Sequence, residues 1–195
     1  MPSQRGTIDR TWWWAAPLSL LIALPTAHAE PPTPLPPLPP NAVVADVGMH
    51  VVNVGYQRIL GTHTVAQISA GLYGPWTVNQ NVLGLAGGDR DDDVIGAVAR
   101  VRAFYFFAPS APTGPWLSPF VQAGPVSATR AGASTDGTAF AVGASLGWTW
   151  RVAARWLVAV GVGAQYHRVS FAGSTERPGF SLPAPQLDVN VDYAF

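Results

Sequence analysis

Cysteine and lysine are both absent from this chain of 195 residues. Without cysteine there is no disulfide framework, no thiol chemistry and no lipobox cysteine for a lipoprotein anchor. An exported product must therefore be stable without covalent cross-links. The lack of lysine removes the commonest cation of soluble protein surfaces, so every basic residue is an arginine.

Charge is scarce as well. Asp, Glu, Lys and Arg make up 11% of the chain, against roughly 25% in an ordinary soluble domain. Hydrophobic residues make up 48% and the formal net charge is +0, so there is no electrostatic case for binding nucleic acid. The length suits one domain, but a water-facing surface is hard to build from this composition.

The N-terminus has the pattern of a cleavable signal peptide. Two arginines precede an apolar run over residues 12–24, and Ala27-His28-Ala29 supplies the small-x-small cleavage pattern. Processing after Ala29 leaves 195 − 29 = 166 residues. A retained membrane helix is the alternative, but the run is shorter than the roughly 20 residues that a span needs and two prolines interrupt it.

A proline-rich segment follows, and we assign residues 30–41 to a linker. Its core, PPTPLPPLPP, has no backbone N–H at most positions and favours an extended polyproline II conformation. The segment is interpreted as a stiff periplasmic spacer, with a docking site for a proline-binding partner as the alternative. The remaining residues, 42–195, form the predicted domain.

Period-two alternation dominates this domain, and no helical periodicity of useful length occurs. In the last segment Leu187, Val189 and Val191 alternate with Asp188 and Asn190, as a strand between two environments requires. Six strands can be assigned directly, over residues 64–74, 94–107, 116–128, 138–151, 155–171 and 184–195.

The character of the two faces indicates which side of the sheet is outside. One face is rich in Gly, Ala and Ser with a few charges, which suits the crowded interior of a narrow barrel. The other face carries bulky side chains, with aromatic residues gathered at strand ends as in an interfacial girdle. That girdle comprises Tyr105, Phe107, Trp116, Trp148, Trp150, Trp156, Tyr193 and Phe195.

The connections sort into two groups, as in outer-membrane barrels with short periplasmic turns and long outside loops. Short links are expected at residues 60–63, 108–115 and 151–155, and long polar links at 75–93, 130–137 and 172–183. The stretch from residue 41 to 59 is about twice the roughly 9 to 11 residues of one crossing. A hairpin hidden near residues 48–53 gives eight strands, and a single bulged strand would leave seven.

The closing pattern of Val191, Tyr193 and Phe195 resembles the C-terminal signal of bacterial outer-membrane proteins, whose terminal aromatic is read by the barrel-assembly machinery. With the export signal and the alternating strands, the domain is similar to the eight-stranded outer-membrane protein A-like superfamily. The opening NAVVADVGMHVVNVGYQRIL is also similar to that of uncharacterised small barrels. The chain departs from the superfamily in having no peptidoglycan-binding domain after Phe195, so that anchoring role is not expected.

Polar residues on the inward phase are expected to form a network, because charges inside a narrow barrel must be paired. A polar, porin-like conduit is the alternative, but eight strands leave an interior just wide enough for side chains to fill it. The predicted lumen network comprises Asp46, Arg100, Arg102, Gln122, Gln165, His167, Asp188, Asn190 and Asp192.

Catalytic chemistry has weak support. His167 with Ser170, Ser174 and Glu176 has the residue types of a hydrolytic triad. However, lipid A deacylases carry His-x-Ser-Asn on the penultimate strand, whereas this chain has His167-Arg168-Val169-Ser170, which moves the serine to the opposite side of the strand. We therefore expect no enzyme activity, with a lipid A-modifying enzyme as an alternative.

A cluster of carboxylates lies in the loop over residues 87–93, with the sequence GGDRDDD. Oxygen ligands of this kind suit calcium, but the alternating spacing of a calcium-binding loop is missing. We interpret the loop as solvated charge near the divalent ions of lipopolysaccharide, and expect neither a metal site nor a cofactor.

These observations predict a monomeric all-β protein of the bacterial outer membrane, exported through the inner membrane. Its expected partners are outer-membrane lipid, lipopolysaccharide and the barrel-assembly machinery. Its expected role is structural, or lies in surface interaction through the outside loops. A soluble lipocalin-like carrier of small ligands is the remaining alternative, and would need an apolar lumen.

Overall fold

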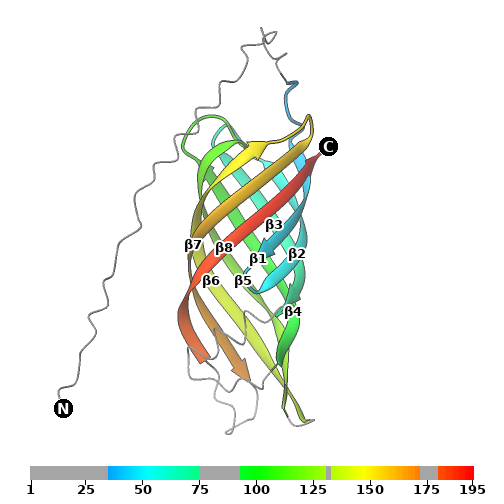
Figure 1. Ribbon diagram of the computed structural model, residues 1–195, viewed down its shortest axis with the longest axis vertical. Helices are drawn as coiled ribbons and strands as arrows, with labels where there is room; N and C mark the ends of the chain where they lie inside the picture. Colours follow the sequence, from blue (N-terminus) through cyan, green and yellow to red (C-terminus); the bar gives the residue numbers. More distant parts are fainter. Residues whose placement is uncertain (1–34, 75–92, 131–132, 172–179) are drawn as a thin grey trace, which may run out of the picture. The chain divides into compact units, whose positions relative to one another are not determined.

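A computed structural model describes residues 35–74, 93–130, 133–171 and 180–195 of the chain. Eight antiparallel strands form a closed up-and-down barrel in which each strand pairs with its neighbours in sequence and β1 pairs with β8 (Figure 1). The strands are β1 Asn41–Gly48, β2 Val51–Ile59, β3 Thr64–Tyr73, β4 Asp93–Phe106, β5 Gly114–Arg130, β6 Ala133–Arg151, β7 Trp156–Phe171 and β8 Phe180–Ala194. The predicted all-β barrel of eight strands is confirmed.

The hidden hairpin lies where the phase of alternation changes. Val47 pairs with Val52, so Met49 and His50 form the turn between β1 and β2. The outward phase before the turn includes Val47 and the outward phase after it includes Val54. The seven-strand alternative, with one bulged strand, is therefore wrong.

The two ends of the barrel differ in their connections. At one end, named the turn end, lie residues 60–63, 107–113 and 152–155, together with Phe195 (Figure 1). The opposite end, named the loop end, carries the β1–β2 turn and the remaining links. The three predicted short links all lie at the turn end, and the link within residues 130–137 lies at the loop end as predicted, although it is shorter than predicted.

The prediction of a long polar link over residues 130–137 is wrong. Strand pairing between β5 and β6 continues to Arg130 and Ala133, so only residues 131 and 132 connect the two strands. Strand pairing depends on backbone hydrogen bonds, which form regardless of side-chain polarity. A hairpin that projects beyond the barrel wall can therefore have polar side chains on both faces. For the same reason β8 begins at Phe180 rather than at residue 184.

Side chains alternate between the outside and the lumen along every strand, as the pleat requires. On β7, Val162 is 63% exposed whereas Gln165 and His167 are each 3% exposed. Seven of the eight residues predicted for the aromatic girdle lie on the outer face: Tyr105, Phe107, Trp148, Trp150, Trp156, Tyr193 and Phe195.

Trp116 is the exception, and its predicted place in the girdle is wrong. Its side chain is 1% exposed and lies inside the barrel. Trp116 shares its strand phase with Gln122, which the alternation places inward. Its bulk suggested an outward position, but glycines at the paired positions of β6 and β7 leave room for the indole, as described below.

Within the described residues there is no helix long and apolar enough to cross a membrane. The predicted signal peptide with its cleavage residues Ala27 and Ala29, and the linker up to residue 34, lie outside the described residues. From Leu35 to Pro40 the chain has no regular secondary structure, and the carbonyl of Pro40 accepts a hydrogen bond from the Ile59 N–H at 2.8 Å.

Candidate functional site

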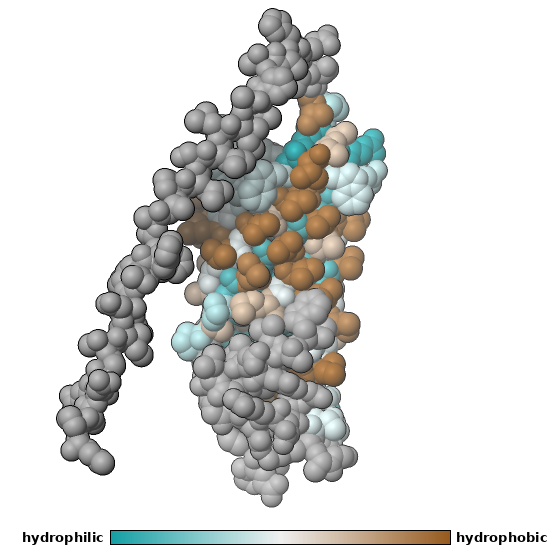
Figure 2. Space-filling view, in the orientation of Figure 1, coloured by the Kyte–Doolittle hydropathy of each residue, from teal (hydrophilic) through white to brown (hydrophobic). Residues whose placement is uncertain are grey.

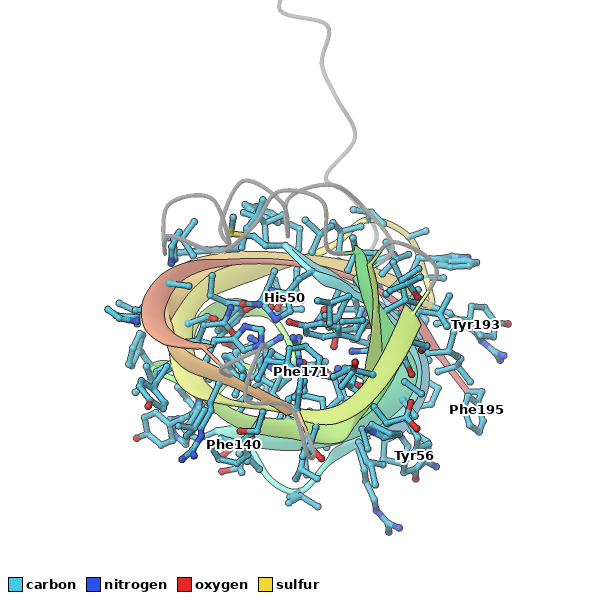
Figure 3. All side chains as sticks on the ribbon, turned by 90° about the horizontal axis from the view of Figure 1, so that it is seen from below. His50, Tyr56, Phe140, Phe171, Tyr193 and Phe195 are labelled. Carbon is cyan, nitrogen blue, oxygen red and sulfur yellow. The ribbon has the colours of Figure 1, made fainter. Side chains whose placement is uncertain are left out.

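The lumen is the candidate site, because the buried polar and charged side chains of the described residues gather there. Viewed along the barrel axis, His50 and Phe171 lie within the ring of strands, while Tyr56, Phe140, Tyr193 and Phe195 project outward (Figure 3). The middle of the barrel is ionic, and hydrophobic side chains pack on either side of this layer.

Two arginines of β4 and two aspartates from β1 and β8 form the centre of the ionic layer. Arg100 Nη1 lies 3.1 Å from Asp46 Oδ2 and 3.4 Å from Asp188 Oδ1. Arg102 Nη2 lies 2.6 Å from Asp188 Oδ2. These ion pairs link β4 to β1 and β8 on the other side of the barrel, so they connect opposite parts of the wall through the lumen.

Neutral side chains supply further hydrogen bonds to these charges, although Arg100 Nη2 and Arg102 Nη1 have no partner among the described residues. Gln122 Oε1 accepts from Arg100 Nε at 3.0 Å, and Ser118 Oγ accepts from Arg102 Nε at 2.8 Å. Asp188 also accepts from Gln186 Nε2 at 2.6 Å and from the Ser145 hydroxyl. Such bonds are needed because a buried charge with unmet hydrogen bonds is strongly unfavourable.

Aromatic faces cover the guanidinium groups. Arg100 lies over the ring of Phe120 and Arg102 over the ring of Phe104, each at 4.9 Å from the ring centroid. Arg102 also lies 5.7 Å from the centroids of Trp116 and Phe120. Cation–π contact of this kind favours arginine over lysine, because the planar guanidinium can stack and still donate at its edges.

An aromatic cluster fills the lumen on the turn-end side of the ionic layer, formed by Val65, Phe104, Phe106, Trp116 and Ala159. Phe104 and Trp116 meet edge to face with centroids 5.1 Å apart, and Trp116 Nε1 donates to Thr149 Oγ1 at 2.9 Å. A Cβ built on Gly147 or Gly161 would lie 2.4 Å from an indole carbon of Trp116. Glycine at these two positions is therefore what admits the indole.

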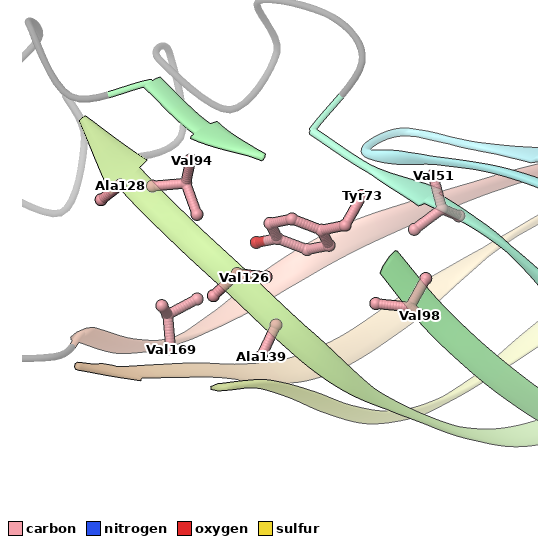
Figure 4. Close-up of a cluster of buried hydrophobic side chains, with 8 residues drawn as sticks. All are labelled: Val51, Tyr73, Val94, Val98, Val126, Ala128, Ala139 and Val169. Atoms are coloured by element: carbon pink, nitrogen blue, oxygen red, sulfur yellow. The ribbon is translucent and has the colours of Figure 1, made fainter. Parts of the chain in front are cut away.

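A second hydrophobic cluster lies on the loop-end side of the ionic layer (Figure 4). It comprises Val51, Tyr73, Val94, Val98, Val126, Ala128, Ala139 and Val169. The lumen is thus closed by hydrophobic packing on both sides, a feature that the small residues of the inner face did not predict.

Two histidines lie beside this second cluster. Tyr73 Oη and His167 Nε2 are hydrogen-bonded at 2.8 Å, and the rings of His50 and His167 have centroids 4.9 Å apart. His50, in the β1–β2 turn, has its pKa lowered to about 3, mainly by burial and further by repulsion from His167 and Arg100. Burial disfavours the charged imidazolium, so His50 is neutral at physiological pH.

The residues predicted for the lumen network divide into separate groups. Those that lie in the ionic layer are Asp46, Arg100, Arg102, Gln122, Asp188 and Asn190. With the side-chain amide of Asn190 oriented so that its nitrogen faces Asp46, that nitrogen lies 3.2 Å from Asp46 Oδ1. Gln165 and His167 lie near His50, with Gln165 Nε2 at 3.4 Å from His50 Nδ1. Asp192 is 2% exposed, and its Oδ1 has no hydrogen-bond partner among the described residues.

Several members of the ionic layer were missed at the level of sequence. Asp46 Oδ2 accepts from Asn53, Gln67 and Ser69 at 3.3, 3.5 and 3.4 Å, and the hydroxyl groups of Ser118 and Ser145 are equally central. Each lies on the inward phase of its strand, so period-two alternation was the available signal. Their small or neutral side chains gave no reason to single them out.

Of the candidate triad residues, only His167 and Ser170 are described, and they lie on opposite faces of β7. His167 faces the lumen at 3% exposure, whereas Ser170 Oγ accepts a hydrogen bond from Arg168 Nε, an exposed group, at 3.3 Å. Ser174, Glu176 and the acidic loop up to residue 92 lie outside the described residues. Within the described part of the chain, no group of three or more His, Cys, Asp or Glu side chains is arranged to hold a metal ion.

Comparison with known proteins finds similarity to solved structures. No family model matches the chain, and no curated protein matches it. Among solved structures, the chain is similar to the N-terminal β-barrel domain of Pseudomonas aeruginosa OprF, with a TM-score of 0.38 and 14% sequence identity over 80% of this chain and 100% of that one. The closed eight-stranded barrel itself fits the resemblance to the outer-membrane protein A-like superfamily.

Proposed function

We propose that this protein is an integral barrel of the bacterial outer membrane with a closed, side-chain-filled lumen. Its role in this proposal is structural, or lies in surface interaction through the loop end. The observation that carries the proposal is the inverted distribution of polarity: charged side chains are buried inside the barrel, and large hydrophobic side chains cover its outside.

The outer face is too apolar for contact with water. Ile68, Val101 and Leu146, on three different strands, are 57%, 54% and 54% exposed. The visible face of the barrel carries a band of hydrophobic residues along the strands (Figure 2). Contiguous exposed apolar surface of this extent favours hydrocarbon, and a closed barrel meets the requirement that every backbone polar group be satisfied within lipid.

Barrel closure also supports the proposed monomer. Because β1 pairs with β8 through residues 42–48 and 188–194, the sheet closes on itself there and offers no open edge at that height for a second copy to extend. The aromatic residues at the turn end match an interfacial girdle, which supports a periplasmic position for that end.

The filled lumen argues for a structural rather than a conducting role. The ionic layer pairs its arginines and aspartates directly, and hydrophobic clusters lie on both sides of it. An ion crossing the lumen would have to displace these side chains. We therefore propose that the protein is not a general diffusion pore.

The export route remains part of the proposal. Residues 1–29 would direct the chain through the inner membrane and be removed after Ala29. The terminal pattern of Val191, Tyr193 and Phe195 would then be read by the barrel-assembly machinery. Lipopolysaccharide is the proposed partner at the loop end.

Cell fractionation combined with gel mobility tests this function. The protein should sediment with outer-membrane markers and migrate differently in sodium dodecyl sulfate before and after boiling, because a folded barrel resists detergent until heated. Purified protein that stays compact and dispersed in buffer without detergent would show that the hydrophobic face does not meet lipid, and would refute the proposal.

A further inference from the structure

The turn end of the barrel carries three arginines. Arg58 near the end of β2, Arg151 at the end of β6 and Arg155 just before β7 are all at least partly exposed. The ion pairs of the described residues involve only Asp46 and Asp188, both in the lumen. No described Asp or Glu side chain is therefore paired with these three arginines.

Two of the arginines flank one short turn. Val152, Ala153 and Ala154 lie between Arg151 and Arg155, and Val152 is 60% exposed. Arg151 Nη2 donates to the Ala154 carbonyl at 2.6 Å and Arg151 Nε to the Ala153 carbonyl at 3.4 Å. These bonds hold the guanidinium over the turn and leave further N–H donors for an anion.

Tryptophans surround this turn on the outer face of the barrel. Trp148, Trp150 and Trp156 are 45%, 49% and 46% exposed. The rings of Trp148 and Trp150 have centroids 6.4 Å apart, and Trp156 meets Tyr193 edge to face at 5.1 Å. Indole rings of this kind favour the boundary between hydrocarbon and headgroups.

An open groove of about 850 Å³ lies beside the same residues. Its lining includes Pro37, Leu38, Pro112, Trp148, Trp150 and Arg151. Trp148 and Trp150 also belong to the outer face, so part of the groove wall faces the side that meets lipid in the proposed function. The groove thus places an apolar channel next to a fixed cation.

The geometry points to a binding site for an anionic glycerophospholipid of the inner leaflet, with its headgroup phosphate at Arg151 and Arg155 and an acyl chain against Trp148 and Trp150. Charge complementarity selects this occupant, because uncompensated arginines at a membrane surface attract anionic headgroups. This inference rests on the proposed insertion in the outer membrane and adds the class of lipid recognised at the periplasmic end.

Tryptophan quenching by brominated lipids tests the site in protein purified from the cell envelope. The protein is placed in mixed vesicles of phosphatidylglycerol and phosphatidylcholine in which one or the other lipid carries bromine on its acyl chains. Brominated phosphatidylglycerol should quench more strongly than brominated phosphatidylcholine at equal mole fraction. In 1 M salt, where the Debye length falls to about 3 Å, the difference should largely disappear.

Arginine variants locate the effect. Arg151→Gln and Arg155→Gln should each lower the preference for phosphatidylglycerol about fivefold, since each arginine near an anionic surface contributes about 1 kcal/mol. Arg168→Gln is the matched control, because Arg168 is exposed on β7 away from the turn end and should leave the preference unchanged. Should a variant fail to fold, the salt dependence of the unaltered protein still decides the question.

Heat-modifiable mobility in vesicles of phosphatidylcholine alone separates this inference from the proposed function. A protein that does not fold into any vesicle refutes both. A protein that folds but is quenched equally by the two lipids overturns the phospholipid site alone. A preference for phosphatidylglycerol that persists in the variant with both Arg151→Gln and Arg155→Gln also overturns the phospholipid site. So does a preference that emerges only once residues 30–38 are deleted, because the chain's own proline-rich segment would then occupy the groove.

Discussion

Packing of Trp116 of β5 against Gly161, two strands away on β7, allows a sharp test of the filled lumen. A Cβ on Gly161 would lie 2.4 Å from Trp116 Cη2, while its other close contact, the Leu146 carbonyl, is at 3.1 Å. Gly161→Ala therefore forces the indole to move. Overpacking of a filled core costs typically about 1–3 kcal/mol, and we expect about 2 kcal/mol here.

The clash should vanish when the indole is shortened. Trp116→Phe removes both indole atoms that meet the added methyl group, although it also loses the hydrogen bond to Thr149. In the Trp116→Phe background, Gly161→Ala should lower the free energy of unfolding by less than about 0.5 kcal/mol, which is the range within which the effects of independent substitutions usually add. The double-mutant cycle should therefore give a coupling of about 1.5 kcal/mol.

Urea unfolding in phospholipid vesicles measures these differences, with the folded fraction read from gel mobility so that loss of a tryptophan does not affect the signal. Gly61→Ala is the control, since nothing lies within 4 Å of its added Cβ. An equal cost of Gly161→Ala in both backgrounds would mean that Trp116 does not occupy the space above Gly161. The description of the turn-end cluster would then be wrong.

Three further predictions address other parts of the protein. Asp188→Ala should cost about 3–5 kcal/mol in urea unfolding, because it leaves the buried guanidinium of Arg102 without a carboxylate while Arg100 keeps Asp46, and adding Arg102→Met should recover part of this loss. The folded-state pKa of His50, about 3, lies below the ordinary histidine value of 6.5, so the unfolded chain protonates first as pH falls. The contribution of His50 to the free energy of unfolding should be complete above pH 6.5 and decline toward pH 3, by at most about 1.4 kcal/mol per pH unit. His50→Asn should reduce the slope of the free energy of unfolding against pH. An unchanged slope would show that His50 is not buried as a neutral group. Phe195→Ser should lower the folded fraction in cells several-fold but leave refolding into vesicles unchanged, and equal loss in both would contradict a role confined to assembly.

Alternation accounts for most of what was predictable here. Because the side-chain period of a strand is two, placing one face outside assigned Arg100, Arg102 and Asp188 to the lumen before any strand pairing was known. The same rule placed Trp116 inward, through its shared phase with Gln122, and only its size argued for the girdle. For Trp116, the position in the strand alternation predicted the inward side correctly, and the size of the side chain did not.

Partners within the lumen were beyond the reach of the sequence. Arg100 and Asp46 lie 54 positions apart, and their contact depends on the relative height of β1 and β4 in the barrel. That height follows from the stagger of all the strand pairs together, which no local pattern specifies. The turn at Met49 and His50 differs, because a change of phase within one segment revealed it.

The sequence by itself limited the number of strands to seven or eight, assigned the inward or outward face of nearly every side chain, and showed the excess of hydrophobic over charged residues on which the proposed membrane location rests. Only the tertiary structure decided how the interior is filled: that hydrophobic clusters lie on both sides of one ionic layer, and that Trp116 rests where Gly147 and Gly161 leave space. The physical reason is that alternation is a property of each strand alone, whereas contact across a barrel requires side chains from several strands to meet at one height.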